Sequence, residues 1–226
     1  SDASVGRVFA TCREPERAPG LRALVASDTS RLVVLALDAS REDTIAHAAE
    51  RVGNETKELH LIVNVAGVLH GPGFGPEKKL AQIRPEALRT AFEVNAFGPL
   101  LVAKHFHAFL RHDARSVFAS ISARVGSISD NRLGGWYAYR GSKAAQNMFT
   151  KNLSIELGRI APAAIVVGLH PGTVDTDLSK PFQRNVSREQ LLSAGASVGS
   201  LLGVIDGLRP EDTGKVFDFR GKEIAP

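Results

Sequence analysis

A tyrosine and a lysine one helical turn apart are the residues of this chain best suited to acid–base chemistry. Tyr139 and Lys143 are separated by four positions, so on a helix they lie on one face. A phenol, whose ordinary pKa is about 10, becomes a useful acid or base when that pKa moves toward neutrality. A neighbouring ammonium group favours the phenolate and would lower the pKa of Tyr139. The same spacing also occurs on ordinary exposed helices, so its meaning depends on the surrounding chain.

The surrounding chain alternates short apolar runs with longer helical segments. Strands are expected at residues 8–12, 32–37, 59–65, 116–121, 163–169 and 216–219. Helices are expected near Tyr139 and at residues 21–26, 40–52, 85–110 and 187–202. Ser40 and Asp43 resemble a capping box at the second helix, and Pro99 predicts a kink in the third. The alternation predicts an α/β fold, a doubly wound parallel sheet of Rossmann type, in one domain spanning residues 1–226.

Polar and small residues gather where these strands end. Ligands of doubly wound sheets bind outside the carboxyl ends of the strands. The residues found there are Arg13, Asp38, Asn64 to Gly67, Ser122, Pro171 and Gly172. Each of them alone fits an ordinary turn or helix entry. Their common position instead predicts that Tyr139 and Lys143 belong to a ligand site.

Four motifs, in this order, resemble those of the short-chain dehydrogenase/reductase family, in particular its small bacterial carbonyl-reductase-like members. They are Asn64-Val65-Ala66-Gly67, Asn95 in Glu93-Val94-Asn95-Ala96, Tyr139 with Lys143, and Pro171-Gly172-Thr173 with Thr176. The resemblance runs from about Arg7 to the C-terminus. It implies an oxidoreductase that interconverts a small-molecule carbonyl and a secondary alcohol.

The resemblance also implies the catalytic roles. Tyr139 would pass a proton to or from the substrate oxygen, while a nicotinamide exchanges a hydride at the same carbon. Lys143 would hold the nicotinamide ribose and lower the pKa of Tyr139. Asn95 would interrupt its helix to hold a water molecule of the proton relay, although a tolerated polar residue remains the alternative.

The expected cofactor is NADP(H), in preference to NAD(H). Arg13 ends its strand where an acidic residue would bind the ribose 2′-hydroxyl of NAD, whereas an arginine accommodates a 2′-phosphate. Further contacts implied by the resemblance are those of Asp38 and Ala39 to the adenine, of Asn64, Ala66 and Gly67 to the adenosine side, and of Pro171, Gly172, Thr173 and Thr176 to the nicotinamide end.

The chain departs from the family pattern in two places. Relatives carry a catalytic serine three residues before the glycine that corresponds to Gly126, and this position is Ala123. Ser122 is the expected replacement and Ser127 a weaker one, although neighbouring side chains of a strand point to opposite faces. The second departure is the family's first strand, glycine-rich loop and first helix, which do not occur within residues 1–226. We expect the gene to encode them.

Composition narrows the functions that the chain could have. A net charge of +4 without a cluster of Lys and Arg beyond Lys78-Lys79 argues against a nucleic-acid groove. No run has transmembrane length, and the single cysteine suits a reducing cytoplasm. His105, His107 and His112 fit an interface of a homodimer or homotetramer better than a metal site, so no metal is expected. The competing function is a non-catalytic dimeric scaffold or dinucleotide sensor, which Ala123 favours and the intact Tyr139 and Lys143 oppose.

Overall fold

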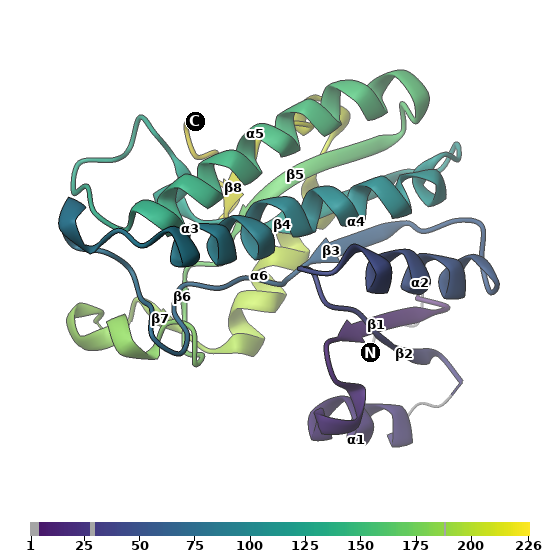
Figure 1. The fold of residues 1–226 in the computed structure, drawn as a ribbon. Helices are drawn as coiled ribbons and strands as arrows, with labels where there is room; N and C mark the ends of the chain where they lie inside the picture. Colours follow the sequence, from purple (N-terminus) through teal and green to yellow (C-terminus); the bar gives the residue numbers. More distant parts are fainter. Residues whose placement is uncertain (1–4, 28–29, 188) are drawn as a thin grey trace. The chain divides into compact units, whose positions relative to one another are not determined.

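The computed structural model describes residues 5–27, 30–187 and 189–226, which divide into two compact units (Figure 1). The first unit comprises Ser1–Lys57 and the second Glu58–Pro226. Each is described by itself. That residues 1–226 form one domain stays a prediction.

The first unit is built on a pair of parallel strands. β1 (Val8–Cys12) pairs with β2 (Leu32–Ala36) in a register that matches Val8 with Leu32. Between them lie η1 (Pro15–Arg17) and α1 (Pro19–Ser27), and after them follows α2 (Glu42–Gly53). The apolar side chains of α2 recur at helical spacing and are buried, namely Ile45, Ala48, Ala49 and Val52. These residues form the buried apolar face of an amphipathic helix.

The entry into α2 differs from the predicted capping box. The N-cap residue is Arg41, without a side-chain cap, rather than Ser40. Ser40 instead belongs to a local turn with Asp38, in which the backbone N–H and the hydroxyl of Ser40 both donate to Asp38 Oδ1, at 2.9 and 2.7 Å. Aspartate favours such local turns, and in this turn the Ser40 hydroxyl bonds to Asp38 instead of capping the N-terminus of α2.

The second unit contains a four-stranded parallel sheet in the order β3-β4-β5-β8. The strands are β3 (Leu61–Asn64), β4 (Ser116–Ile121), β5 (Ala164–His170) and β8 (Val216–Asp218). All four strands were predicted, with ends that differ by at most two residues. Within the described residues β3 is paired along one edge only, and its Leu61 and Val63 are exposed.

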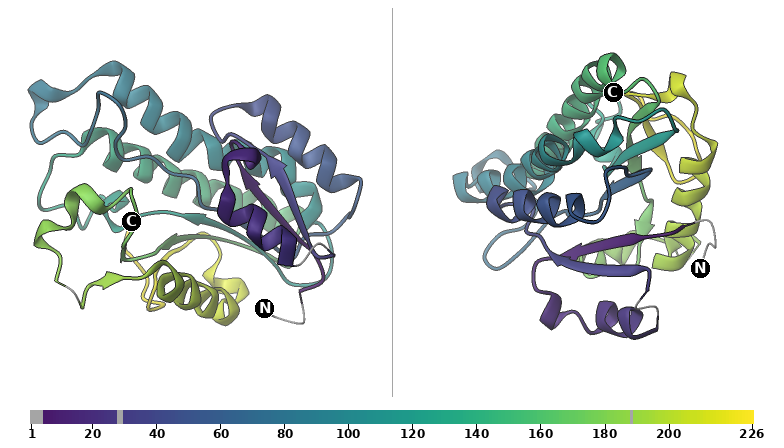
Figure 2. Two further views of the ribbon diagram at one scale, coloured as in Figure 1. Left: turned by 90° about the horizontal axis from the view of Figure 1, so that it is seen from below. Right: turned by 90° about the vertical axis from the view of Figure 1, so that its right-hand side faces the viewer.

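Helices cover both faces of this sheet, which explains why its central strands are apolar throughout. Alternate residues of β4 and β5, such as Val117 and Val167, pack on one face against Leu201 and Ile205 of α6 (Ala194–Gly207). α5 (Tyr137–Ile160) lies along the other face (Figure 2). Each central strand is therefore buried on both sides, as in other parallel sheets. The second unit is a Rossmann-type parallel sheet with flanking helices.

The long helix predicted at 85–110 is broken, but not at Pro99. The segment forms α3 (Pro85–Phe92), a π-helical turn η3 (Glu93–Phe97), α4 (Gly98–Phe106) and η4 (His107–Leu110). Pro99 sits in the first turn of α4, where a proline's missing N–H does not disrupt the helix. The interruption is centred on Asn95, and π-turns of this kind often mark functional positions.

The prediction of a helix at 187–202 was wrong in its first part. Leu191 and Leu192 form β7, paired with β6 (Thr173–Val174), and α6 begins only at Ala194. Ser193 caps it, because its hydroxyl accepts a hydrogen bond from the Ala196 N–H at 3.2 Å. Arg188, inside the predicted range, lies outside the described residues. The remaining short helices are η2 (Leu80–Gln82), η5 (Arg124–Gly126), η6 (Lys180–Asn185) and η7 (Pro210–Asp212).

Across the described ranges, no helix combines the length and the apolar character needed to cross a membrane.

Candidate active site

Tyr139 and Lys143 lie in the first two turns of α5, as predicted from their spacing. Lys143 is buried, and its Nζ donates hydrogen bonds to the Ile121 carbonyl at 2.7 Å and to Gln146 Oε1 at 2.9 Å. The same Nζ lies 5.9 Å from the centre of the Tyr139 ring. The lysine therefore connects the end of β4 with the tyrosine turn of α5. Within the part of the chain that the structure describes, the Tyr139 hydroxyl has no hydrogen-bond partner.

Burial controls the pKa values of both groups. It raises the pKa of Tyr139 to about 12 and lowers the pKa of Lys143 to about 7. The expected lowering of the Tyr139 pKa by the lysine charge is not found in this structure, because the cost of burying a charged group exceeds the attraction between the two charges. At neutral pH Tyr139 is therefore a protonated phenol, which is the form of an acid.

Asn95 ties the segment after β3 to α5. It is fully buried in the π-turn η3, and its Oδ1 accepts from the Val68 N–H at 2.7 Å. Its Nδ2 donates to the Val68 carbonyl at 2.8 Å and to Ser142 Oγ at 3.0 Å. Ser142 Oγ in turn donates to the Tyr139 carbonyl at 2.9 Å. The helix interruption expected at Asn95 is present, and the asparagine braces the turn that carries Tyr139.

The segment that follows β3 comes close to these groups at Gly67. A Cβ placed on Gly67 would lie 3.6 Å from Asn95 Oδ1 and 3.9 Å from Lys143 Nζ. Asn64, at the end of β3, donates from Nδ2 to Ser120 Oγ at 3.3 Å. Ala66 and Gly67 are both exposed, so backbone next to the lysine is open to a ligand.

Neither candidate serine has a hydrogen bond to Tyr139 within the described residues. Ser122 is buried, and its hydroxyl donates to Asn147 Oδ1 at 2.6 Å. Asn147 is eight residues beyond Tyr139, or about 12 Å along a helix axis. Ser127 is buried too, and its hydroxyl interacts with Ser129 and accepts from the Asp130 N–H. The catalytic role of Ser122 stays a prediction.

The segment predicted to meet the nicotinamide end follows β5. Gly172 has φ +78, and a Cβ there would lie 3.0 Å from side-chain atoms of Leu192 and Phe219, so this turn requires glycine. Pro171 is held by its carbonyl, which accepts from Ser197 Oγ at 2.8 Å. Thr173 belongs to β6, and the Thr176 hydroxyl donates to the Val174 carbonyl at 3.4 Å. No hydrogen bond joins these residues to Tyr139 or Lys143 in the described part of the chain.

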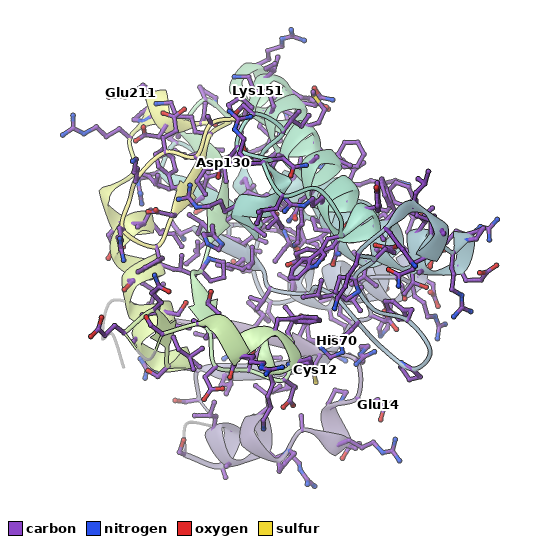
Figure 3. All side chains as sticks on the ribbon, turned by 90° about the vertical axis from the view of Figure 1, so that its left-hand side faces the viewer. Cys12, Glu14, His70, Asp130, Lys151 and Glu211 are labelled. Atoms are coloured by element: carbon purple, nitrogen blue, oxygen red, sulfur yellow. The ribbon has the colours of Figure 1, made fainter. Side chains whose placement is uncertain are left out.

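Aromatic rings surround the start of α5. The Trp136 ring centre lies 6.2 Å from that of Tyr139 and 5.2 Å from that of Phe182 in η6. Phe182 in turn lies 5.8 Å from His70, which is labelled in Figure 3 beside the light-green segment that carries η6. His70 Nε2 is 3.2 Å from the Asp177 and Leu178 carbonyls. Trp136 therefore packs between Tyr139 and Phe182 in an aromatic cluster at the start of α5.

Sequence reasoning missed Glu77, which braces the tryptophan. Trp136 has left-handed backbone angles, φ 53 and ψ 42, which cost a non-glycine residue about 1–2 kcal/mol. Its N–H donates to the Glu77 carbonyl at 2.5 Å, and the Ala138 N–H donates to Glu77 Oε2 at 3.3 Å. Glu77 is buried, so a carboxylate caps α5 from a distant loop. No local signal marks such a contact, because the two residues are far apart in the sequence.

The residues predicted in the first unit form a separate group. Arg13 is exposed after β1, Asp38 is half-buried, and Ala39 is buried. Burial raises the pKa of Asp38, but hydrogen bonds from Ser40 and the charges of Arg13 and Arg41 outweigh it and hold that pKa below its ordinary value. An exposed cation beside a fixed carboxylate is a suitable arrangement for a ribose phosphate and an adenine edge.

Chemistry, rather than shape, identifies the site. Two hollows of about 410 and 340 Å³ are lined mainly by α6 with β8 and by residues 73–87, and neither includes Tyr139 or Lys143. The structure brings together Tyr139, Lys143, Asn95 and Gly67, with Ser142 and Gln146 as supports that the sequence analysis did not assign. The sequence could have indicated both supports, because Ser142 and Gln146 follow Tyr139 by three and seven residues and so lie on the same face of the helix.

Comparison with known proteins identifies the family of the chain. The family model described as short chain dehydrogenase matches residues 4–187. The C-signal of Myxococcus xanthus is 37% identical over 169 residues, covering 75% of this chain and 93% of the relative. The 1-hydroxy-2-glutathionyl-2-methyl-3-butene dehydrogenase of Rhodococcus sp. (strain AD45) is 30% identical over 179 residues, covering 79% and 74%.

Solved structures of carbonyl reductases share the fold. NADPH-bound carbonyl reductase from chicken fatty liver has a TM-score of 0.86 at 29% identity, covering 98% of this chain and 88% of that one. Carbonyl reductase Sniffer of D. melanogaster has a TM-score of 0.85 at 25% identity, with the same coverage. The chain belongs to the short-chain dehydrogenase/reductase family and is an oxidoreductase of that type.

Proposed function

We propose that the protein is an NADPH-dependent carbonyl reductase in which Tyr139 protonates the substrate oxygen. Bound NADPH would supply a hydride to the carbonyl carbon. Tyr139 would donate its hydroxyl proton to the oxygen, so that a ketone or aldehyde becomes an alcohol. The observation that carries the proposal is a protonated, unpartnered phenol next to a buried lysine on one turn of α5.

Burial raises the pKa of Tyr139 to about 12, so at neutral pH the protonated phenol is its common form and the phenolate is rare. A general base for alcohol oxidation would have to begin from this rare form, whereas an acid for carbonyl reduction begins from the common one. Carbonyl reductases among the structural relatives agree with this direction.

The remaining residues would hold the reactants. Lys143 would turn from the Ile121 carbonyl toward the nicotinamide ribose, and Asn95 would keep the Tyr139 turn in place. The exposed backbone at Ala66 and Gly67 fits the adenosine side of a cofactor, since Gly67 has no side chain to exclude it. Pro171, Gly172, Thr173 and Thr176 would contact the nicotinamide end, and Asp38 with Ala39 the adenine.

The preference for NADP(H) over NAD(H) rests on Arg13. Its exposed guanidinium would bind the 2′-phosphate with charge-assisted hydrogen bonds. Structural relatives bound to NADPH and NADP support this part of the proposal. The proposal also retains a cytoplasmic location and a homodimer or homotetramer.

A matched pair of tyrosine variants tests the proposal. NADPH oxidation is followed by absorbance with a panel of small ketones and aldehydes. Tyr139→Phe should lower kcat by about 10²–10⁴, the usual contribution of a general acid. Its NADPH affinity, measured by fluorescence titration, should stay unchanged. The exposed Tyr137→Phe, two residues earlier, should behave like the wild type. Comparable turnover by both variants would reject Tyr139 as the acid.

The second candidate function is a non-catalytic dinucleotide sensor. It is favoured by Ala123 at the family's serine position and by the relative at 37% identity, whose name is that of a signal. A sensor would bind NADPH tightly yet oxidise it with none of the carbonyl compounds. Turnover that depends on Tyr139 would exclude this alternative.

A further inference from the structure

Three side chains with metal-binding atoms meet just before β3. Glu58, His60 and His112 each offer one ligand atom, and these atoms all lie within 4.8 Å of one another. The three residues belong to the second unit and are separate from the groups around Tyr139. Figure 1 shows the beginning of β3 and the end of α4 on the right, whereas α5 begins on the left.

Backbone contacts bring the three residues together. The Leu59 N–H donates to the Phe109 carbonyl at 2.9 Å, and the Leu59 carbonyl lies 3.1 Å from His112 Nε2. Leu59 is thus fastened on both sides to the end of η4. Glu58 and His60 flank Leu59 in the segment just before β3. The fold therefore holds the pair beside His112.

The hydrogen bond to Leu59 also determines which nitrogen of His112 is available. A carbonyl oxygen only accepts, so Nε2 carries the proton in this contact. His112 Nδ1 is buried and has no hydrogen-bond partner among the described residues. Because no acceptor of the described residues lies beside the buried Nδ1, this nitrogen is unprotonated and its lone pair is available to a metal. Metal-binding histidines commonly donate their other ring N–H to a backbone carbonyl in this way.

We propose that Glu58, His60 and His112 bind one zinc ion or a similar divalent transition metal. Two imidazoles and one carboxylate are a donor set that suits zinc, with water as a fourth ligand, and imidazole disfavours magnesium and calcium. Tetrahedral bonds of about 2.0–2.2 Å require ligand atoms about 3.4 Å apart. Glu58 and His60 are exposed, so rotation of their side chains can bring the ligand atoms from within 4.8 Å of one another to this shorter distance. The His60 and His112 rings already lie 4.9 Å apart between centres.

The position of the site indicates a structural ion. A metal bound there would tie the beginning of β3 to the segment that follows η4. Since the Tyr139 turn is at the other end of the sheet, zinc should raise the thermal midpoint of the protein without changing its turnover. Binding to the folded state alone stabilises it by mass action.

Calorimetric titration of the protein with zinc chloride tests the site. The wild type should bind one ion per chain. Glu58→Gln, His60→Gln and His112→Gln should each weaken binding at least tenfold, because even loss of a residue that only supports a ligand costs about 10–100-fold. The control is His47→Gln, an exposed histidine of α2 that faces Glu50 at 3.8 Å, and it should bind zinc like the wild type.

Cobalt provides an independent readout. Tetrahedral cobalt bound to the wild type should show visible absorption bands, which Glu58→Gln and His60→Gln should lose. These two substitutions change exposed side chains, so circular dichroism should show an intact fold. Absence of zinc binding at micromolar concentration would overturn the proposal. Equal zinc binding by His60→Gln and the wild type would overturn it as well, and so would equal stabilisation by magnesium.

Discussion

The Tyr139 turn and the Arg13–Asp38 group are built in opposite ways. Around Tyr139 the polar groups are buried and bonded to the fold, as Asn95 and Lys143 show. In the first unit Arg13 is exposed, and Asp38 is held by a short local turn with Ser40. The proposed chemistry thus depends on long-range packing, whereas the proposed recognition of the nucleotide depends on side chains that are nearly independent of it.

This difference predicts how substitutions in each region behave. A buried polar group left without its partner costs about 1–3 kcal/mol, so changes near Tyr139 should affect stability and activity together. Changes at exposed charges should affect affinity while leaving stability nearly unchanged. The proposed variants test that distinction in order of decreasing effect.

Asn95→Ala should have the largest effect. It removes both hydrogen bonds to Val68 and the one to Ser142, and stability should fall by about 1–3 kcal/mol for each group left unpaired. Because the Tyr139 turn loses its brace, kcat should fall by at least about a hundredfold. Urea unfolding and steady-state kinetics measure the two losses. Asn152→Ala, at an exposed position of α5, is the control. A loss of activity with unchanged stability would contradict the comparison.

Lys143 should make stability depend on pH. Its pKa is about 7 when folded and ordinarily 10.5, so above pH 7 the unfolded chain binds more protons than the folded one. Stability should therefore rise with pH, by at most about 1.4 kcal/mol per pH unit. The rise should run from about pH 7 to pH 10, above which ionisation of Tyr139 in the unfolded chain opposes it.

Lys143→Met should remove this rise, while Lys151→Met, an exposed lysine on the same helix, should retain it. Urea unfolding at a series of pH values measures the slope. A wild type whose stability is flat or falls between pH 7 and pH 10 would show that Lys143 is not buried as described.

The sequence predicted the elements far better than the contacts between them. All six strands expected from apolar runs are present, since buried parallel strands have a direct sequence signature. The helix spacing of Tyr139 and Lys143 was equally readable. The interruption at Asn95 was expected only from the family resemblance, whereas the kink predicted from the sequence at Pro99 is absent, because that proline lies in the first turn of α4. Long-range contacts leave no signal in the local sequence, as shown by the hydrogen bond between Glu77 and Trp136 and by the proximity of Glu58 to His112.

Arg13→Asp should change cofactor choice without changing the fold. Loss of charge-assisted bonds to a 2′-phosphate costs roughly 1.5–3 kcal/mol, and 1.4 kcal/mol corresponds to about tenfold in affinity. The ratio of kcat/KM for NADPH to that for NADH should therefore fall by about 10–100-fold. The unfolding midpoint should stay constant, because Arg13 is exposed. Arg22→Asp, an exposed arginine of α1, should leave the ratio unchanged. A constant ratio in Arg13→Asp would remove this residue from the cofactor site.

Ala123→Ser should have the smallest effect on kcat. Together with Ser122→Ala, it tests whether the catalytic serine position is residue 123 or residue 122. Relatives carry a serine at this position, where its hydroxyl would donate to the substrate carbonyl. Such a neutral hydrogen bond contributes about 0.5–1.5 kcal/mol, so kcat should rise about two- to tenfold. Ser122→Ala removes the donor to Asn147 Oδ1 and should lower stability by about 1 kcal/mol with kcat unchanged. If Ser122→Ala instead lowers kcat a hundredfold while Ala123→Ser has no effect, Ser122 is the catalytic serine and the strand end rearranges to present it.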